Sequence, residues 1–397
     1  MKDTQPEKPN IAVIVGSGIR LSPDNAIAIE AILSNFIDVL RPISNQIYAI
    51  IGDFAYELDS RIHVIRRKAK AREEWLLISF FRFILAQLWV SYSLVKIAKS
   101  IDIVIFHTGT RLFILPILVS KLLGKKTVSC VTGRVSMAAR TKYRRTLFGI
   151  WGVIGPFAYR LIEGINFLLA DQIAVESPST IDFMDMGRYR KKIVINGAMY
   201  VDTNSFNIRK RSQDRKAIIG YIGRLAENKG IKNFVEAISS LLQKQENLEI
   251  WIGGGGPLLE EVKEKIKQYK LGDKVKLLGW IPHEKLPEYL NELKLMVFPS
   301  YSEGLPGIVQ EAMDCGTVVL ASPVGGVPDL IEDGVTGFIL ENNSPAGIVE
   351  SSLKALNHPE LEKIAQNAHK LIEKEYKYEV MVGKCKQALD KLTRDKG

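Results

Sequence analysis

Short apolar runs alternate along the chain with longer stretches whose apolar residues recur at helical spacing. In the first half these runs predict strands at 11–15, 46–51, 61–65, 102–106, 126–131, 171–175 and 192–195. In the second half they predict strands at 217–222, 248–252, 275–278, 295–298, 318–321 and 338–340. Strands that alternate with helices form parallel, doubly wound sheets. The pattern therefore predicts an α/β protein with two such sheets.

Helical periodicity predicts helices between these strands and at the end of the chain, at 24–40, 229–243, 257–269, 283–291, 305–314, 344–357, 359–375 and 378–393. Residues 196–216 interrupt the alternation, because they are polar, basic and poor in apolar periodicity. We therefore predict an N-terminal domain at 1–200, a linker at 201–216 and a C-terminal domain at 217–377, with residues 378–397 packing back on the first domain. Ligands bind beyond the carboxyl ends of strands in open α/β sheets, so we expect a site in a cleft between the domains.

Residues 75–98 form the most apolar stretch and are nearly long enough to span a bilayer. Arg82, Gln87, Ser91 and Lys96 are distributed around the predicted helix rather than kept to its ends. This distribution favours a helix buried in the domain over one that spans a membrane. A helix that partly faces lipid is the alternative.

The overall composition, with 46% hydrophobic and 25% charged residues in 397, is typical of a globular protein with two domains. The three cysteines, Cys130, Cys315 and Cys385, have no metal-like spacing and argue against a disulfide scaffold or a zinc site. The first ten residues are polar and contain no apolar core, so we expect no signal peptide and a cytoplasmic protein.

Positive charge is concentrated in the first half. Residues 1–210 contain 29 Lys and Arg against 17 Asp and Glu, whereas the remainder contains 25 and 27. Basic clusters at 66–72 and 140–145 lie beside the apolar stretches 75–98 and 147–157. Such neighbours are what a peripheral contact with an anionic membrane needs. Basic loops beside core helices, with no partner, are the alternative.

The segment 298–316, FPSYSEGLPGIVQEAMDCG, joins a strand to a helix that has Pro306 near its first position. Backbone N–H groups at such a helix end attract a phosphate. Glu303 in the loop and Glu311 in the helix place a carboxylate on either side of it. Carboxylates accept hydrogen bonds from sugar hydroxyls, so this segment is a candidate site for a phosphorylated sugar ligand.

Arg224 and Lys229 lie across another strand–helix turn, where two cations would neutralise a diphosphate. A salt-bridged pair at a helix start is the alternative. Glycine-bearing turns follow four predicted strands, at Gly16–Gly18, Gly223, 253–256 and 325–326. Glycine lets the backbone approach a ligand or another segment closely. Their common place at carboxyl strand ends indicates a ligand cleft.

None of the five histidines pairs with another at metal spacing, and the chain has no Asp-x-Asp pair that would hold a metal-bound diphosphate. We therefore expect no metal, with charge neutralisation from Arg224, Lys229 and helix ends. His107 ends a predicted strand and is a candidate ligand contact or acid–base group. A structural histidine is the alternative.

Residues 217–357 resemble the nucleotide-binding domain of retaining GT-B glycosyltransferases of family 4, the glycosyl transferases group 1. The segments that carry the resemblance are YIGRLAENKG, IGGGGP, LLGWIPHEKLPEYL, VFPSYSEGLPGIVQEAMDCGTVVLAS and VGGVPDLIEDGVTGFI. The first half is similar more loosely, through residues 169–173, Ser177 and IVINGAMYVDTNSF. The resemblance implies two Rossmann-like domains that face a central cleft.

The resemblance also implies roles for matching residues. Glu303 would act beside the transferred sugar, Arg224 and Lys229 would hold the donor diphosphate, and Glu311 would bind the donor ribose. Trp280–Pro282 would lie against the nucleobase. Further donor contacts are implied for Gly16, Gly18, Gly254, Ile281, Gly304, Leu305, Pro306, Gly307, Ile308 and Val309.

One position departs from the family pattern. Many relatives carry a histidine in the loop after the strand that matches 126–131, and the corresponding residue here is Thr132. Thr132 can hydrogen-bond a sugar hydroxyl but cannot act as an imidazole. His107, Thr132 and Arg134 are therefore the candidates for contacts with the sugar or acceptor, and a slow or inactive enzyme is the alternative.

The sequence thus predicts transfer of a sugar from a UDP- or GDP-sugar to an acceptor hydroxyl, with retention of configuration and without a metal or other cofactor. The basic, apolar first domain favours a membrane lipid or lipid-linked glycan as acceptor, on the inner face of the membrane, and no nucleic acid partner. A sugar-nucleotide epimerase, a sugar phosphorylase and a catalytically silent nucleotide-sugar-binding protein are the alternatives.

Overall fold

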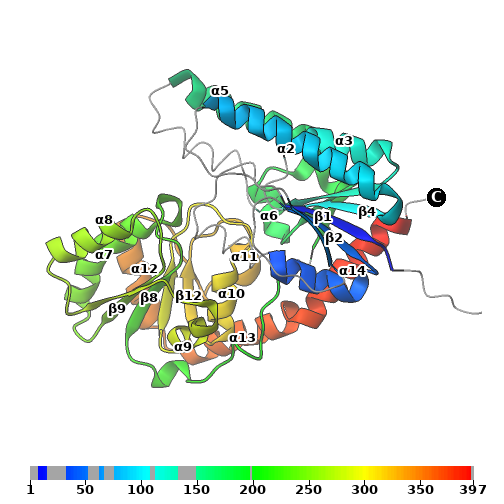
Figure 1. Ribbon diagram of the computed structural model, residues 1–397. Coiled ribbons are helices and arrows are strands. Elements are labelled where there is room, and N and C mark those ends of the chain that lie inside the picture. The colour runs from blue at the N-terminus through cyan, green and yellow to red at the C-terminus, as the bar shows by residue number, and fades with distance from the viewer. Residues whose placement is uncertain are drawn as a thin grey trace, which may run out of the picture. The chain divides into compact units, whose positions relative to one another are not determined.

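The computed structural model describes residues 8–15, 33–51, 62–66, 76–107, 112–132, 149–196 and 199–394 (Figure 1). The chain divides into two compact units. The first comprises Met1–Glu176, Asp185–Ala198 and Met381–Gly397, and the second comprises Ser177–Met184 and Met199–Val380. Residues 201–216, which the sequence assigns to a linker, lie within the second unit.

The first unit contains a seven-stranded parallel sheet in the order β3-β2-β1-β4-β5-β6-β7. Its strands are β1 (Ile11–Val15), β2 (Ile47–Ile51), β3 (Ile62–Arg66), β4 (Ile103–Phe106), β5 (Lys126–Val131), β6 (Gln172–Val175) and β7 (Ile193–Ile195). The central strands β1 and β4 are buried at every position, which explains why they appear in the sequence as unbroken apolar runs.

Helices cover both faces of this sheet (Figure 1). Residues 33–40 are helical, and the other elements are α2 (Leu76–Ile97), α3 (Ile114–Leu122), α5 (Gly149–Leu169), and the 3₁₀ turns η1 (Arg41–Ile43), η2 (Ala98–Ser100) and η3 (Gly187–Lys192). The last helix, α14 (Tyr378–Arg394), begins in the second unit and ends in the first. There the side-chain amide of Gln172 donates a hydrogen bond of 3.0 Å to the Ala388 carbonyl.

The second unit contains a six-stranded parallel sheet in the order β10-β9-β8-β11-β12-β13. Its strands are β8 (Ile218–Ile222), β9 (Glu249–Gly253), β10 (Val275–Gly279), β11 (Leu295–Phe298), β12 (Val318–Ala321) and β13 (Phe338–Ile339). Its helices are α6 (Pro178–Phe183), α7 (Ile231–Lys244), α8 (Leu259–Gln268), α9 (Leu286–Leu290), α10 (Gly307–Asp314), α11 (Val327–Leu330), α12 (Pro345–Leu356) and α13 (Leu361–Glu375), with 3₁₀ turns η4 (Ser212–Asp214), η5 (Glu227–Lys229) and η6 (His283–Lys285). One apolar core joins the central strands to α7, α8, α12 and α13.

The prediction of two parallel, doubly wound sheets is confirmed, and each predicted strand end lies within one residue of the observed one. The predicted start of the helix at 305–314 is wrong. Pro306 is the N-cap, with φ −75° and ψ 113°, and α10 begins at Gly307. The sequence does not predict α11, because a helix of four residues is too short to show helical periodicity.

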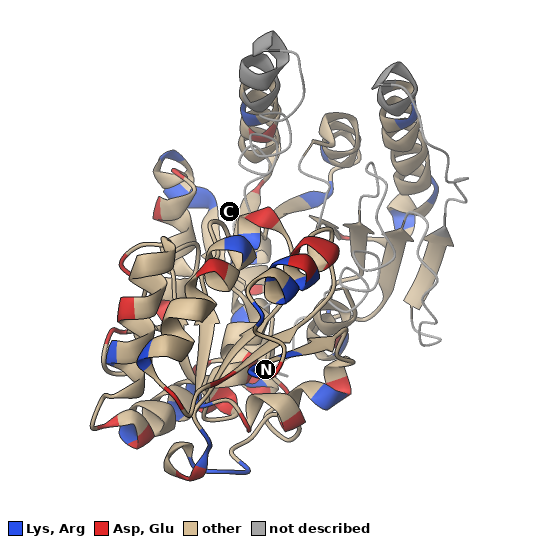
Figure 2. Cartoon of the chain, turned by 90° about the vertical axis from the view of Figure 1, so that its left-hand side faces the viewer, with Lys and Arg blue, Asp and Glu red and all other residues tan. Residues whose placement is uncertain are grey.

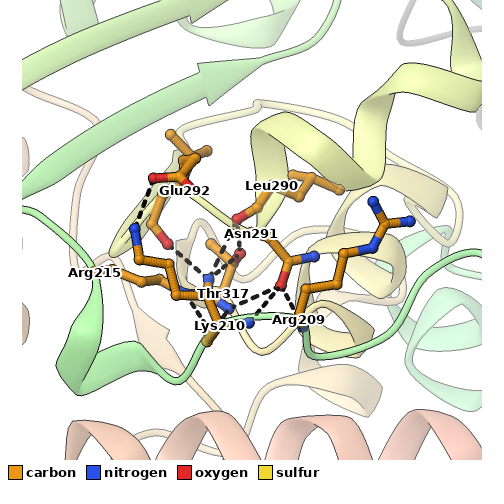
Figure 3. Close-up of polar contacts among 8 residues, drawn as sticks. Arg209, Lys210, Arg215, Leu290, Asn291, Glu292 and Thr317 are labelled. Carbon is orange, nitrogen blue, oxygen red and sulfur yellow. Dashed lines mark hydrogen bonds and ion pairs between the residues drawn. The ribbon is translucent and has the colours of Figure 1, made fainter.

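The segment at 209–215 is fixed to the second unit by a buried arginine (Figure 3). The Arg215 guanidinium donates hydrogen bonds to Thr317 Oγ1 at 2.9 Å and to the Leu293 carbonyl at 2.8 Å. It also donates to the carbonyls of Lys210, Leu290 and Cys315. Beside it, Asn291 Oδ1 accepts a hydrogen bond from the Arg209 N–H at 2.7 Å. Polar contacts rather than apolar periodicity therefore order this segment, which explains why its sequence resembles a linker.

Candidate functional site

The strand order of the second sheet changes direction between β8 and β11, which are neighbours. The chain continues from β8 to β9 and β10 on one side and from β11 to β12 and β13 on the other. The loops that follow β8 and β11 therefore leave the same edge of the sheet side by side. Open α/β sheets bind their ligands at such a switch point.

These two loops bring Lys229 and Glu303 together. Lys229 Nζ lies 2.6 Å from Glu303 Oε1 and 2.7 Å from Oε2, so the ammonium group contacts both carboxylate oxygens. Ser300 Oγ donates a further hydrogen bond to Glu303 Oε1. The Glu303 side chain is 9% exposed and that of Lys229 is 25% exposed. The sequence assigns these residues to different parts of the donor, whereas the structure shows them as one ion pair.

Glycine makes the close approach of the two loops possible. Gly230 has φ +71°, and a Cβ atom there would lie 2.0 Å from the Pro299 carbonyl oxygen. The Tyr301 N–H donates a hydrogen bond of 2.9 Å to the Asn228 carbonyl, which holds the loops in register. The position of Lys229 against Glu303 is thus set by backbone contacts on either side of it.

The loops that follow β12 and β13 support the Glu303 loop from its other side. The Gly326 N–H donates a hydrogen bond to the Gly304 carbonyl at 2.6 Å, and a Cβ atom on Gly325 would lie 2.3 Å from the Glu303 carbonyl oxygen. The Asn343 side-chain amide donates to the Pro299 carbonyl at 2.9 Å. Four neighbouring strands therefore contribute to the position of one carboxylate.

Arg224 lies in the loop after β8 with an exposed side chain. Within the described part of the chain its guanidinium forms no ion pair. The backbone beside it is anchored, because the Tyr221 hydroxyl donates a hydrogen bond of 2.9 Å to the Arg224 carbonyl. Burial, and the nearby charge of Glu303, raise the pKa of Tyr221, so its hydroxyl stays a neutral donor. Arg224 can therefore offer its charge to a ligand.

The N-terminus of α10 directly follows the Glu303 loop. Gly304, Leu305, Pro306 and Val309 are buried, whereas Gly307 and Ile308 are half-buried. The first N–H groups of a helix have no acceptor within the helix and carry partial positive charge. This end of α10 can thus accept an anionic group.

Glu311, in the next turn of α10, lies against a histidine that the sequence does not assign to the site. His283 Nε2 is 2.7 Å from Glu311 Oε1. The hydrogen bond to Glu311 raises the pKa of His283. The Glu311 side chain is 15% exposed and that of His283 is 64% exposed. The predicted ribose-binding carboxylate is therefore partly exposed and already has a polar neighbour.

Two other predicted donor contacts have a role in packing. A Cβ atom on Gly254 would lie 1.9 Å from the Gly223 carbonyl oxygen, so the backbone approach alone requires glycine there. Ile281 is buried, with Cδ1 2.6 Å from the position of a Cβ on Gly253. Its neighbour Trp280 is 54% exposed and offers an aromatic face.

The remaining predicted residues belong to the first unit and are described with it. His107 follows β4, is 1% exposed and stacks on Phe36 with ring centroids 4.5 Å apart. Burial lowers the pKa of His107 to about 4, so the imidazole is neutral. Thr132 is half-buried at the end of β5. Gly16, Gly18 and Arg134 lie outside the described residues.

Sequence reasoning missed Ser300, His283 and Asn343. Ser300 follows β11, His283 follows β10 and Asn343 follows β13. All three lie beyond the carboxyl end of a strand, where such sheets place their catalytic and binding groups. That position is the signal that could have identified them. Among the described residues, no group of three or more His, Cys, Asp or Glu side chains could hold a metal ion.

Residues 203–374 match the family model Glycosyl transferases group 1. The match covers the switch point, the Lys229–Glu303 pair and α10. The chain is also similar to parts of two curated proteins. It is 32% identical over 156 residues to an alpha-D-kanosaminyltransferase of Streptomyces kanamyceticus, covering 39% of this chain and 40% of the relative. It is 32% identical over 149 residues to the phosphatidylinositol N-acetylglucosaminyltransferase GPI3 subunit of Saccharomyces cerevisiae, covering 38% of this chain and 32% of that protein. The matched segments thus span about two fifths and one third of these relatives.

The fold of the whole chain is similar to that of a solved Anabaena protein, Alr3699/HepE, in complex with UDP. The TM-score is 0.69 at 19% identity, and the similarity covers 97% of this chain and 100% of that one. Two parallel-sheet domains of the GT-B type are therefore confirmed for the chain, beyond the segment that the family model matches.

Proposed function

We propose that the protein transfers a sugar from a nucleoside diphosphate sugar to an acceptor hydroxyl. The observation that carries this proposal is the Lys229–Glu303 pair at the switch point of the second sheet, within the glycosyl transferases group 1 domain. The similar proteins support it, because two are named as glycosyltransferases and the Anabaena structure holds UDP.

The charges of the site suit a donor whose leaving group is a diphosphate. A bare carboxylate would repel the diphosphate, but Lys229 neutralises Glu303 at contact distance. The net positive potential then comes from the Arg224 guanidinium and the N-terminus of α10. Groups fixed in this way stabilise negative charge as it develops on the leaving diphosphate, without the cost of reorienting water.

Glu303 and Glu311 have different roles in this proposal. Glu303 is almost fully buried and held by two donors, so its orientation is set before the sugar arrives. It faces the transferred sugar and stabilises positive charge that develops there. Glu311 is more accessible and accepts hydrogen bonds from the ribose hydroxyls of the donor, with His283 beside it.

Retention of configuration and independence from metal ions are part of the proposal. The described site holds a lysine, an arginine and a helix end where a metal would otherwise neutralise the diphosphate. The acceptor hydroxyl attacks the face from which the diphosphate leaves, and a leaving phosphate oxygen takes the acceptor proton. We propose a membrane lipid or lipid-linked glycan as acceptor, because the first unit exposes large apolar side chains.

A donor panel tests the function directly. The purified protein is incubated with UDP-, GDP- and ADP-sugars, and both the nucleoside diphosphate and the remaining donor are measured. Release of nucleoside diphosphate is expected with one nucleotide class, also in the presence of a metal chelator. An altered nucleotide sugar without release would indicate an epimerase, and binding without turnover a silent protein. The anomeric configuration of the product, measured by NMR, tests retention.

A matched pair of variants tests the site. Lys229→Ala is expected to lower turnover by about 100-fold or more, on the scale of removing one charge-stabilising group. Lys232→Ala is the control, because Lys232 forms an ion pair with Glu261 at 2.8 Å in the same domain. Equal activity of the two variants would contradict the assignment of Lys229.

A further inference from the structure

In helix α2 of the first unit several polar residues are buried and many large apolar residues are exposed. Gln87, Ser91 and Ser93 are buried, and the Gln87 side-chain oxygen accepts a hydrogen bond of 3.1 Å from the Leu115 N–H. On the opposite face, Leu88 is 50% exposed and Tyr92 is 58% exposed. Phe81, Ile84, Leu85 and Val95 continue this exposed stripe at helical spacing. A surface helix in water normally has the reverse pattern.

Helices α3 and α5 show the same inversion. In α3, Ser120 is fully buried, whereas Leu115, Leu118 and Leu122 are exposed. In α5, Glu163 and Asn166 are buried, whereas Phe157, Leu161 and Leu168 are exposed. Some of the inner polar groups are hydrogen-bonded where they lie. Asn166 Oδ1 accepts a hydrogen bond of 2.8 Å from Ser129 Oγ, and Ser120 Oγ donates one of 2.8 Å to the Pro116 carbonyl. We call the exposed apolar residues of the three helices the outer apolar face.

The three helices lie next to one another on one side of the first sheet. Helix α3 packs against both α2 and α5. Figure 2 shows the three helices in a row in the upper part of the view. Their described residues are mostly tan, with few charged ones. An exposed apolar surface that extends over three helices is unusual for a protein surrounded only by water.

One edge of the outer apolar face is positively charged. Each of the three helices leads into a strand of a parallel sheet, so their C-termini lie at the same edge. The connections after α2 and α3, with the last turns of these helices, carry the lysines 96, 99, 121, 125 and 126. The carboxylates in the connections of the three helices, Asp102 and Asp171, already accept hydrogen bonds from the Asn10 N–H and from Lys121 Nζ.

Two details of this edge suit a lipid headgroup. Lys96 Nζ lies 4.8 Å from the centre of the Tyr92 ring, so an aromatic side chain and a cation adjoin at the end of the apolar stripe. A cavity of about 290 Å³ beside Leu168 is lined by Lys121, Lys126 and Lys192 and a single carboxylate, Asp171. Aromatic residues and lysines are the groups that proteins place at the boundary between acyl chains and phosphates.

We propose that the outer apolar face lies in the surface of an anionic lipid bilayer, with the lysine edge at the level of the phosphates. Among the described residues, one helical segment is long and apolar enough to cross a membrane, Phe81–Ser100, which comprises most of α2 and the turn η2. Length and composition are weak evidence for spanning, and the buried side of α2, with Val90 and Leu94, packs within the unit. The geometry therefore points to a helix that lies on the membrane rather than across it. This inference does not depend on the proposed activity.

A fluorescent probe tests which surface meets the lipid. The natural cysteines are buried, so a single exposed cysteine can be labelled with an environment-sensitive dye. Leu88→Cys places the dye on the outer apolar face. Val335→Cys, on a residue that is 39% exposed in the second unit, is the control. With vesicles of equal phosphatidylglycerol and phosphatidylcholine, the emission is expected to shift to shorter wavelength for Leu88→Cys and not for Val335→Cys.

Vesicle co-sedimentation tests the contribution of the face and the edge. Leu88→Glu combined with Leu122→Glu is expected to lower the vesicle-bound fraction at least tenfold, with Val335→Glu unchanged. Lys99→Glu with Lys125→Glu should weaken binding to anionic vesicles at low salt. Leu88, Leu122, Lys99 and Val335 are exposed and Lys125 is half-buried, so circular dichroism should show folded variants. No binding of the unaltered protein at low salt would overturn the proposal. A dimer in light scattering that Leu88→Glu dissociates, without vesicle binding, would instead assign the face to a second copy.

Discussion

His283 Nε2 lies 2.7 Å from Glu311 Oε1, which links the loop after β10 to the second turn of α10. The Phe206 ring lies beside the same imidazole, with ring centroids 5.2 Å apart. The hydrogen bond to Glu311 raises the pKa of His283, and the charges of Glu311, Glu284 and Asp202 act in the same direction. The carboxylate that we propose for the ribose is therefore coupled to a titrating group.

We expect Glu311→Gln to lower the pKa of His283 towards its ordinary value of about 6.5. The reason is that an amide cannot stabilise the imidazolium as a carboxylate does. NMR titration of the His283 ring protons measures the change. Glu284→Gln is the control and should lower this pKa less, because Glu284 forms no hydrogen bond to the ring. Equal shifts in the two variants would contradict the dominant role of Glu311.

The same pair should make a small contribution to stability that depends on pH. The folded-state pKa of His283 is raised, so the contribution is complete below about pH 6.5 and is lost as the pH rises through the raised pKa. Solvent screening of the exposed imidazole limits it to about 0.5 kcal/mol. Denaturant unfolding should show His283→Gln less stable than the unaltered protein at pH 6, with a smaller difference at pH 9.

The buried His107 should make the protein less stable as the pH falls, which is the opposite of the effect of His283, and its effect should be larger. Its folded-state pKa of about 4 lies below the unfolded value of about 6.5, so unfolding takes up a proton between these pH values. The unfolding free energy should fall by about 3 kcal/mol as the pH decreases from 6.5 to 4, if other groups are held constant. His107→Gln should remove this component of the pH dependence.

The control for His107 is a core substitution without a titrating group. Ile105→Val, in the neighbouring β4 strand, should cost about 1 kcal/mol by loss of buried surface, at every pH in this range. The unfolding free energy of each variant is plotted against pH. If it falls between pH 6.5 and 4 as steeply for His107→Gln as for Ile105→Val, His107 is not the acid-sensitive group.

Gly230→Ala should separate the two loops of the site. A Cβ atom would meet the Pro299 carbonyl oxygen at 2.0 Å, and φ is +71°. The left-handed backbone alone costs about 1–2 kcal/mol for a residue with a side chain, and the clash adds to this. We expect a destabilised protein with greatly weakened donor binding, measured by thermal unfolding and calorimetry. Gly272→Ala is the control, because a Cβ atom there has open space, and it should leave the thermal stability and the donor affinity unchanged.

Arg215→Met should be among the most destabilising single changes in the second unit. It would remove the Arg215 donor from the buried carbonyls of Leu293 and Cys315, at a cost of about 3 kcal/mol or more, whereas the Leu290 carbonyl keeps the hydrogen bond from Thr317 Oγ1. Denaturant titration of the isolated variant measures this cost. The exposed Arg211, which pairs with Asp214 at 2.9 Å, offers the control Arg211→Met, expected to change stability by less than about 1 kcal/mol.

Local sequence determined the strands, because a buried parallel strand needs an unbroken apolar run and such runs are visible without any tertiary information. It also identified Arg224, Lys229, Glu303 and Glu311 as candidates, since charged residues beside strand ends are visible in the same way. Sequence could not pair them. Lys229 and Glu303 are 74 residues apart, and only the strand order β8-β11 makes their loops neighbours.

Tertiary structure also decided the environment of each residue. Periodicity places polar residues of 75–98 around a helix, but only the packed sheet shows that Gln87 and Ser91 lie inside while Leu88 and Tyr92 lie outside. His107 ends a strand in the sequence, and only the folded structure shows that it is buried, with its ring stacked on Phe36, and that burial lowers its pKa. The sequence alone determines where apolar runs alternate with helical stretches and which residues carry charge. Burial and proximity depend on contacts between distant segments, and these exist only in the folded protein.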